Sequence, residues 1–514
     1  DYSDPDVTRV GSDFYLVSSS FTCVPGLPIL HSKDLVNWTI IGHALPVQVP
    51  ADHFDSVRSG GGVWAPSIRF HAGKFYIFYP DPDYGIYMVT ATDPAGPWSA
   101  PTLVLGGRGL EDPCPLWDDD GKVWLIHAWV GSRSGGKNNI LTLVPLSDDA
   151  TKATGEGKDI IKGADFKLTT AEGPKFYKMN GYYYVFAPVG GVGGGTQAVF
   201  RSKNIEGPYE AHIALAQGGT NVNGPHQGGL VDTPDGKQWW FIHFQDMAAS
   251  SSKGNEGRVD WLEPVVWVND WPVMGNDPNH TGTGEPVLTF QKPDVGASYP
   301  PTAPQTSDEF DAPTLGLQWQ WLANPRDDWY SLTQTPGSLR LVGQPPENSL
   351  VRQPNLLLQK IPAPSFAVTT KLSASSQLPG ERAGLVIYGA PCAWIGLVKT
   401  DTGWRVSQTV SRAGAGATAP DTVTESASAD VSSGSIYLAF SMASDTRAQF
   451  SYSEDGKTFT TLGAPVAIAA IHGSWIGAKF GLFAIGNPPP NPSTAIPKPI
   501  QADFDWIHVT AATP

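Results

Sequence analysis

The chain has 514 residues, which is too long for one ordinary hydrophobic core, so we expect two domains. Its 56 glycines, 46 prolines and 18 tryptophans, with recurrent aromatic runs, indicate an all-β protein that has many turns. The balance of 34 basic and 49 acidic residues gives a net charge of −15, which argues against nucleic-acid binding, and no apolar run reaches the roughly 18 residues of a membrane helix.

One pattern occurs five times in the first half of the chain: a turn-forming head, an apolar strand, a turn with glycine, and an aromatic strand. The copies are SDPDVTRVGSDFYLVSSSF from Ser3, WAPSIRFHAGKFYIFYP from Trp64, EDPCPLWDDDGKVWLIHAW from Glu111, AEGPKFYKMNGYYYVFAP from Ala171 and PHQGGLVDTPDGKQWWFIHF from Pro225. Each begins with a hairpin and leaves room for two further strands. Four-stranded units repeated around an axis form a β-propeller, so we expect five blades over residues 1–290. A sandwich with irregular loops is the alternative.

The heads of the five copies are Asp4, Ala65, Asp112, Glu172 and His226. The first strand of each propeller blade lines the central channel, so we expect all five heads at one mouth of that channel. Three of the heads are acidic, which predicts a cluster of carboxylates there.

A proline-rich segment, residues 291–307, follows the repeats and predicts a linker. Beyond it, over residues 308–514, strand-like runs such as AGLVIYG and IYLAFSMA recur every dozen or so residues, as is typical of a β-sandwich.

The three acidic heads point to chemistry, because carboxylates that converge in a partly apolar funnel repel one another. Capping of a strand or turn explains one such residue better than three in one repeat position. Hydrolysis of a glycosidic bond uses this arrangement: one carboxylic acid protonates the leaving oxygen, another activates water, and a third holds the pKa of the acid near the working pH. Opposite walls of a channel suit the inverting separation of roughly 6.5–9.5 Å.

The tripeptide Glu-Gly-Pro occurs twice, at Glu172 and at Glu206. Glu206 lies in an outer turn, whereas Glu172 stands at a head. We therefore expect Glu206 to be solvated and Glu172 to be functional.

With these motifs, residues 1 to about 285 resemble glycoside hydrolase family 43, which carries an Asp-Pro near the amino terminus, a mid-chain Asp-Pro and a Glu-Gly-Pro. The resemblance implies that Asp4 is the general base, Asp112 the pKa modulator and Glu172 the general acid. Asp6 lies two residues after Asp4, but the family places its base directly before the proline, which favours Asp4. The second domain resembles the concanavalin-like sandwich of family β-xylosidases. Two roles are open for it: it binds polysaccharide, or it lends a loop that walls the active site. We favour the second role, because an exo-acting pocket needs a closed end.

The resemblance also implies a set of substrate-binding residues. Phe21 in SSSFTCVPGLPILHSKDLVNW and Trp64 in GGGVWAPSIRF resemble the two walls of the sugar pocket. His226 in GPHQGG resembles the axial histidine near the pocket floor. Arg258 in GRVDWLEPVVW resembles a substrate-binding arginine, for which a surface arginine at a strand end is the alternative.

Some family members hold a calcium ion, partly through waters, beside the axial histidine, so His226 is the candidate for a structural calcium here. The HQGG motif offers one imidazole and no acidic cluster, and the acid/base scheme requires no cofactor.

The resemblance predicts an inverting exo-glycosidase that releases xylose from the non-reducing ends of β-1,4-xylo-oligosaccharides, with α-L-arabinofuranosidase side activity. One alternative is an enzyme that acts primarily as an α-L-arabinofuranosidase on arabinoxylan. Another, from a different class, is a non-catalytic carbohydrate-binding propeller. The expected partners are xylo-oligosaccharide or arabinoxylan fragments, with neither nucleic acid nor membrane.

The three cysteines are far apart and show neither a disulfide framework nor zinc-ligand spacing, so we expect buried free thiols at Cys23, Cys114 and Cys392. The sequence starts at Asp1 without an initiator methionine or a signal segment, which indicates a trimmed chain. A secreted or periplasmic location is favoured, and the oligomeric state stays open.

Overall fold

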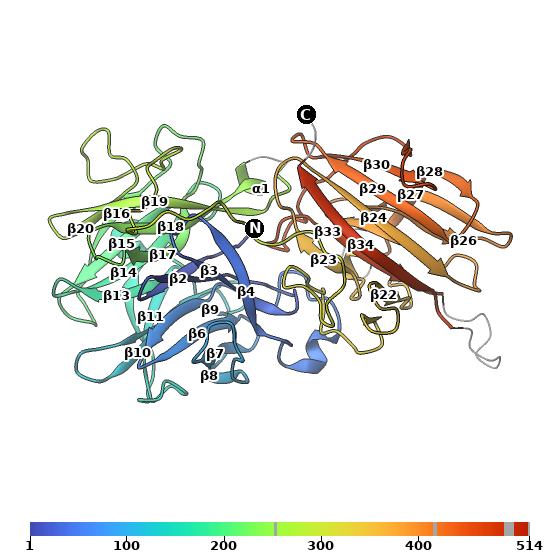
Figure 1. The fold of residues 1–514 in the computed structure, drawn as a ribbon. Helices are drawn as coiled ribbons and strands as arrows, with labels where there is room; N and C mark the ends of the chain where they lie inside the picture. Colours follow the sequence, from blue (N-terminus) through green and yellow to red (C-terminus); the bar gives the residue numbers. More distant parts are fainter. Residues whose placement is uncertain (251–253, 415–418, 488–497, 512–514) are drawn as a thin grey trace.

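The computed structural model describes residues 1–514 except 251–253, 415–418, 488–497 and 512–514, and it shows two β-domains side by side (Figure 1). The first domain consists of five four-stranded antiparallel sheets, each taking its strands in chain order. The predicted five-bladed propeller is therefore confirmed. Among the described residues, no helix has the length and apolar character to span a bilayer.

The strands of the propeller follow the repeats. The first blade contains β1 (Asp6–Val10), β2 (Asp13–Val17), β3 (Gly26–Ser32) and β4 (Trp38–Leu45). The second contains β5 (Ser67–His71), β6 (Lys74–Asp81), β7 (Gly85–Ala91) and β8 (Thr102–Gly106). The third contains β9 (Leu110–Trp117), β10 (Val123–Trp129), β11 (Ile140–Leu146) and β12 (Lys158–Lys162). The fourth contains β13 (Lys175–Met179), β14 (Tyr182–Val189), β15 (Thr196–Ser202) and β16 (Glu210–Leu215). The fifth contains β17 (His226–Asp232), β18 (Trp239–Asp246), β19 (Arg258–Val268) and β20 (Trp271–Met274).

The hairpin that opens each blade depends on its turn chemistry, and the fourth blade illustrates this. Met179 pairs with Tyr182, which leaves Asn180 and Gly181 as a two-residue loop. Both loop residues have positive φ, 52° and 75°. A two-residue loop of this kind matches the right-handed twist of the flanking strands, and Asn-Gly is the pair that adopts it most readily. The local sequence thus fixes the register in which β13 and β14 pair.

The second domain is a sandwich of two antiparallel sheets, as predicted, and its main core fills the space between them. The larger sheet contains β21 (Tyr330–Ser331), β22 (Leu339–Val342), β24 (Phe366–Ser375), β29 (Ser435–Met442), β30 (Arg447–Ser453), β31 (Thr460–Thr461), β32 (Val466–Ala467) and β34 (Gln501–Ala511). The smaller sheet contains β23 (Leu357–Lys360), β25 (Arg382–Tyr388), β26 (Cys392–Lys399), β27 (Trp404–Arg412), β28 (Thr422–Val431) and β33 (Lys479–Ile485). Short helices are η1 (Ala51–Asp55), η2 (Gly163–Phe166), α1 (Met247–Ser250) and η3 (Leu350–Arg352).

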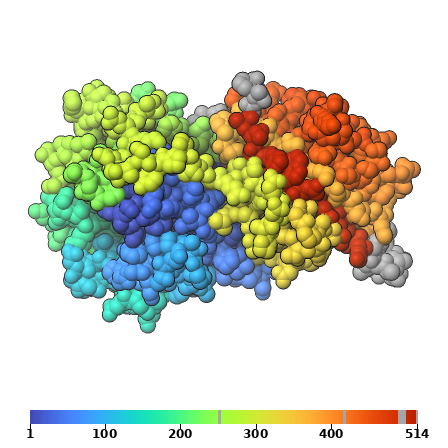
Figure 2. Space-filling view, viewed as in Figure 1, coloured from blue at the N-terminus to red at the C-terminus, as the bar shows by residue number. Residues whose placement is uncertain are grey.

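The proline-rich segment 291–307 contains no helix or strand and lies along the propeller surface (Figure 2). The backbone N–H of Asp294 donates to Gln238 Oε1 at 3.0 Å, and that of Thr302 donates to Asn37 Oδ1 at 3.0 Å. These bonds hold the segment to the fifth and first blades, so the linker is packed on the propeller where it connects the two domains. We propose that the propeller spans residues 1–290, the linker 291–307 and the sandwich 308–514.

The two domains share a buried interface. Val24 and Trp321 exchange backbone hydrogen bonds of 2.9 and 2.6 Å across it, and Phe21 packs in one cluster with Trp394 and Phe483. Burial of this aromatic surface favours one fixed placement of the sandwich against the first blade. Cys23, Cys114 and Cys392 are free and buried, as expected.

Candidate active site

A cavity of about 290 Å³ lies at one mouth of the propeller channel. All five blades and the sandwich domain contribute to its lining. The lining residues are Asp4, Phe21, Trp64, Ala65, Glu111, Asp112, Val130, Glu172, Gly191, Val192, His226, Gln227, Arg258 and Trp475. All seven residues proposed from the sequence for catalysis or substrate binding are in this set, and so is Ala65, the head of the second copy.

Beneath this cavity, side chains from several blades fill the channel. The Arg69 guanidinium donates to Asp6 Oδ2 at 2.6 Å and to the sulfur of Cys114 at 2.9 Å, and it lies 5.0 Å from the centre of the Tyr177 ring. The backbone N–H of Leu230 donates to the Tyr177 hydroxyl. A buried ion pair with these additional partners holds a plug on the axis, so the cavity is a pocket with a floor.

The five heads do not share one backbone position, which corrects the alignment inferred from the repeats. Asp4 and Asp112 directly precede proline and have left-handed φ angles of 55° and 54°. In the fourth blade that position belongs to Gly173, with φ 58°, and Glu172 stands one residue earlier. Trp64 is equivalent to Glu172, because the N–H of each donates to a proline carbonyl of the second strand, at 3.1 and 3.2 Å. Glu172 thus reaches the cavity from a backbone position one residue before the position that Asp4 and Asp112 occupy in their blades.

The left-handed backbone conformations of Asp4, Asp112 and Gly173 belong to the active site and not to surface turns. Non-glycine residues rarely adopt positive φ, and such conformations cluster at active sites, although aspartate tolerates them well. At Gly173, an added Cβ would lie 2.8 Å from the side chain of Gln227 and 3.0 Å from Pro188. Only glycine fits there, which is the physical reason for the middle residue of the Glu-Gly-Pro motif.

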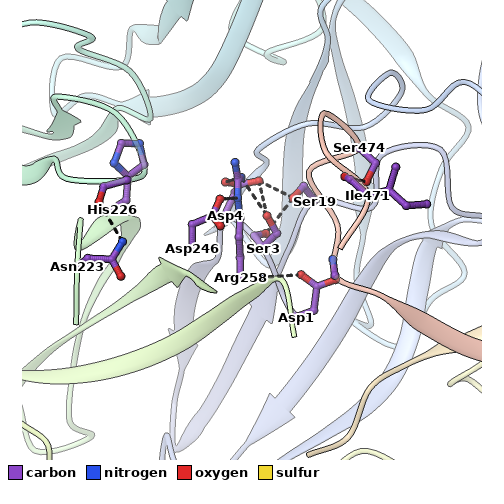
Figure 3. Close-up of polar contacts among 12 residues, drawn as sticks. Asp1, Ser3, Asp4, Ser19, Asn223, His226, Asp246, Arg258, Ile471 and Ser474 are labelled. Carbon is purple, nitrogen blue, oxygen red and sulfur yellow. Dashed lines mark hydrogen bonds and ion pairs between the residues drawn. The ribbon is translucent and has the colours of Figure 1, made fainter. Parts of the chain in front are cut away.

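Asp4 is held by three donors (Figure 3). Arg258 Nη1 lies 2.6 Å from Oδ1, while the hydroxyls of Ser19 and Ser3 donate to Oδ2 at 2.6 and 2.9 Å. Arg258 also lies 3.6 Å from an oxygen of Asp246, and its guanidinium is 4.6 Å from the centre of the Phe244 ring. Charge-assisted bonds of this kind are short and strong, and together they fix the orientation of the Asp4 carboxyl group.

Asp112 is in a different environment. It is 5% exposed, and its Oδ2 accepts a hydrogen bond of 2.8 Å from the backbone N–H of Gly173. Burial, followed by the negative charges of Glu172 and Asp4, raises the pKa of Asp112 to about 7. The bond to Gly173 also ties this carboxyl group to the backbone that carries Glu172.

Glu172 is paired with His226. The imidazole Nε2 lies 2.7 Å from Glu172 Oε1, and the histidine is almost fully buried against Phe244. One carboxylate oxygen is therefore anchored to a rigid ring, which orients the side chain in the cavity.

Sequence reasoning missed a fourth carboxyl group and a tryptophan. Glu111 lines the cavity beside Asp112, and burial with the charges of Asp112, Glu172 and Asp4 raises its pKa well above the usual range. Its place before the pre-proline residue, equivalent to Glu172, is the signal that identifies it. Trp475 comes from the sandwich loop between β32 and β33, and no repeat or motif indicates it.

Aromatic side chains form the walls. Phe21 is buried at the domain interface, and its backbone pairs with Val63. The indole of Trp64 donates to the carbonyl of Gly60 at 3.0 Å, and the Arg133 guanidinium lies 5.8 Å from its ring centre. Trp475 is 41% exposed and stands 5.7 Å from Arg258. Apolar ring faces beside several carboxylates suit the apolar and hydroxylated faces of a sugar.

The surroundings of His226 do not fit the calcium ion considered from the sequence. Calcium takes six to eight oxygen ligands. His226 gives its Nε2 to Glu172, and among the described residues no group of three or more His, Cys, Asp or Glu side chains is placed to hold a metal ion.

Comparison with known proteins extends over both domains. A family model described as "Glycosyl hydrolases family 43" matches residues 1–272, and one described as "Beta xylosidase C-terminal Concanavalin A-like domain" matches residues 307–510. The chain is 33% identical over 533 residues to a β-xylosidase from Formosa agariphila, which covers 94% of this chain and 86% of that protein.

Two further similarities cover nearly the whole chain. A non-reducing end α-L-arabinofuranosidase from Bacteroides ovatus is 30% identical over 524 residues, covering 98% of this chain and 92% of that protein. The crystal structure of a xylan β-1,4-xylosidase from Bacillus halodurans matches with a TM-score of 0.84 at 26% identity, covering 99% of this chain and 98% of that chain. These findings confirm the resemblance drawn from the motifs and identify an enzyme rather than a non-catalytic propeller. The chain belongs to glycoside hydrolase family 43 and is a glycosidase of the β-xylosidase and α-L-arabinofuranosidase type.

Proposed function

We propose that the protein is an inverting exo-glycosidase that releases xylose from the non-reducing ends of β-1,4-xylo-oligosaccharides. The observation that carries this proposal is the meeting of Asp4, Asp112 and Glu172 in one cavity that has a floor. A volume of about 290 Å³ is just below the roughly 300–1,000 Å³ that is usual for ligand pockets, which suits one terminal sugar better than the middle of a chain.

In the proposed mechanism, Glu172 is the general acid and Asp4 the general base. Glu172 gives its proton to the glycosidic oxygen as the bond to the anomeric carbon breaks. Asp4 takes a proton from the water that attacks that carbon from the opposite face, so the configuration inverts. The different partners of the two groups support this division, because the Arg258 cation pairs with Asp4 while His226 orients Glu172.

Asp112 is the proposed modulator. Its bond to the N–H of Gly173 positions the backbone beside Glu172. Its negative charge, when present, repels negative charge on Glu172, which is the proposed basis of the modulation. Phe21, Trp64 and Arg258 are the proposed contacts for the sugar. The scheme uses side chains alone and requires no cofactor.

A second activity, on α-L-arabinofuranosides, is part of the proposal. The Bacteroides ovatus relative that aligns over 98% of this chain is named as an α-L-arabinofuranosidase. A small pocket whose walls are aromatic rings discriminates two pentoses only through the hydroxyls it binds.

Release of nitrophenol from the β-D-xyloside and the α-L-arabinofuranoside tests the function, and NMR of the first product anomer tests inversion. Glu172→Gln and Asp4→Asn should each lower kcat by at least about 100-fold, in the range of general acid–base catalysis, without loss of fold. Glu206→Gln is the control, because Glu206 is exposed and pairs with Lys158 on the surface. Near-normal turnover in either cavity variant would reject the role assigned to that residue.

A further inference from the structure

Glu111 reaches the cavity from a distorted part of the third blade. It lies near the start of β9 and pairs with Ala128 of β10, next to a shift in the register of the two strands between Ile126 and Ala128. Irregular pairing of this kind re-aims side chains and is common beside active sites. The irregular pairing therefore helps to direct the Glu111 side chain into the pocket.

Among the described residues, the carboxyl group of Glu111 has no hydrogen-bond partner, and its interactions are with charges around the cavity. The residue is 5% exposed, and within the described part of the chain neither of its oxygens has a hydrogen bond. Most buried polar side chains in proteins are hydrogen-bonded, so an exception of this kind calls for a reason. The reason available here is that the cavity contents, rather than the protein, supply the partner.

The neighbours of Glu111 determine its charge. Three acids face it, Asp112, Glu172 and Asp4, and one cation, Arg133, opposes them. Arg133 is shared, because it also lies 3.8 Å from Asp83 and over the ring of Trp64. Burial and the three acids outweigh Arg133 and raise the pKa of Glu111. An uncharged carboxylic acid has an O–H donor in addition to its acceptor oxygen.

We propose that Glu111 is a substrate-binding residue whose carboxylic acid donates its O–H to a hydroxyl of the sugar in the cavity and thereby helps to select that sugar. This inference rests on the proposed function, since it takes a pentose as the occupant. It adds a donor to a pocket that is otherwise rich in acceptors. A hydroxyl in the wrong position leaves the acid unpaired, which is how buried polar groups discriminate between similar ligands.

The test compares Glu111→Gln with Glu111→Ala on the two nitrophenyl substrates. The amide of glutamine is neutral and keeps a donor and an acceptor, so Glu111→Gln should retain the wild-type ratio of kcat/KM between the two sugars and the wild-type pH profile. Glu111→Ala removes the donor and should lower kcat/KM for the preferred sugar about tenfold, the size expected for one hydrogen bond, and change the ratio. Glu206→Gln and Glu206→Ala are the matched controls on the surface.

Two results would overturn the inference. One is an unchanged ratio in Glu111→Ala. The other is a shift of the acidic limb in Glu111→Gln by half a pH unit or more, which would show that Glu111 acts as a charge. The second result decides the matter even where the alanine variant does not fold. Absence of activity on both sugars in the wild type would instead refute the proposed function.

Discussion

Asp112→Asn replaces a carboxyl group that the fold makes difficult to ionise. Asparagine has nearly the same shape, is among the residues that best tolerate left-handed backbone, and can still accept the hydrogen bond from Gly173. The substitution therefore changes the charge of the site and little of its geometry. Its effect on stability is expected to depend on pH.

The magnitude follows from the pKa of Asp112, which burial and the charges of Glu172 and Asp4 raise from 3.8 to about 7. One pKa unit corresponds to about 1.4 kcal/mol, so an ionised Asp112 costs the folded state on the order of 4 kcal/mol. The unfolded chain releases this proton near pH 4 and the folded chain near pH 7. Wild-type stability from this group is consequently lost as the pH rises through that window, and the asparagine variant has no such loss.

Differential scanning calorimetry at pH 5 and pH 8 measures this effect. Relative to wild type, Asp112→Asn should gain about 2–4 kcal/mol between pH 5 and pH 8, with most of the gain below pH 7. In the same variant, kcat/KM should fall by at least about 100-fold and its pH profile should shift. Asp120→Asn, in the exposed hairpin turn of the same blade, is the control and should show no gain. An equal stability difference at both pH values would refute the reasoning.

Three further substitutions test the supports of the site. Gly173→Ala should lower kcat/KM by about 100-fold, because the new Cβ strains the backbone next to Glu172. A normal rate would show that the left-handed backbone at residue 173 is not required for catalysis. Arg258→Lys should lower kcat/KM by about tenfold or more, since Nη1 contacts Asp4 while a different nitrogen, Nε, faces Asp246, and one ammonium cannot replace both; steady-state kinetics on the xyloside measure it. Trp475→Ala should raise KM several-fold and leave the pH profile unchanged, and an unaltered KM would remove the sandwich from the binding surface.

The sequence predicts the propeller well because the repeat is local. Each blade is one meander of four consecutive strands, so every hairpin signal, such as Asn180-Gly181, belongs to the sheet in which it lies. The repeat predicts less well which backbone position each head side chain occupies. Glu-Gly-Pro contains one residue more before its proline than Asp-Pro does, and this offset places Glu172 and Asp112 at different backbone steps. Counting back from the proline would have shown that Glu111 and Glu172 are equivalent.

Trp475 could not be predicted in this way. The strands of the sandwich can be read from alternating runs, but a loop between β32 and β33 has no period, and its contact with the cavity depends on how the two domains pack. That packing uses Phe21 and Val24 of the first blade. The segment that contains Phe21 and Val24 therefore forms part of the pocket wall and also binds the sandwich domain, whose loop completes the pocket.

The ring of blades closes between the first and the fifth, and the site crosses this seam. In the described residues, each of the two blades is built from its own consecutive strands, so side chains hold β1 to β17. Arg9 pairs with Asp232 at 2.7 Å, and a buried apolar cluster of Val7, Leu16, Val231 and Ile242 lies alongside. Asp4 stands on one side of the seam and Arg258 on the other, 2.6 Å apart. Any opening of the ring would separate the proposed base from its cation, so the integrity of the fold and the geometry of the reaction depend on the same contacts.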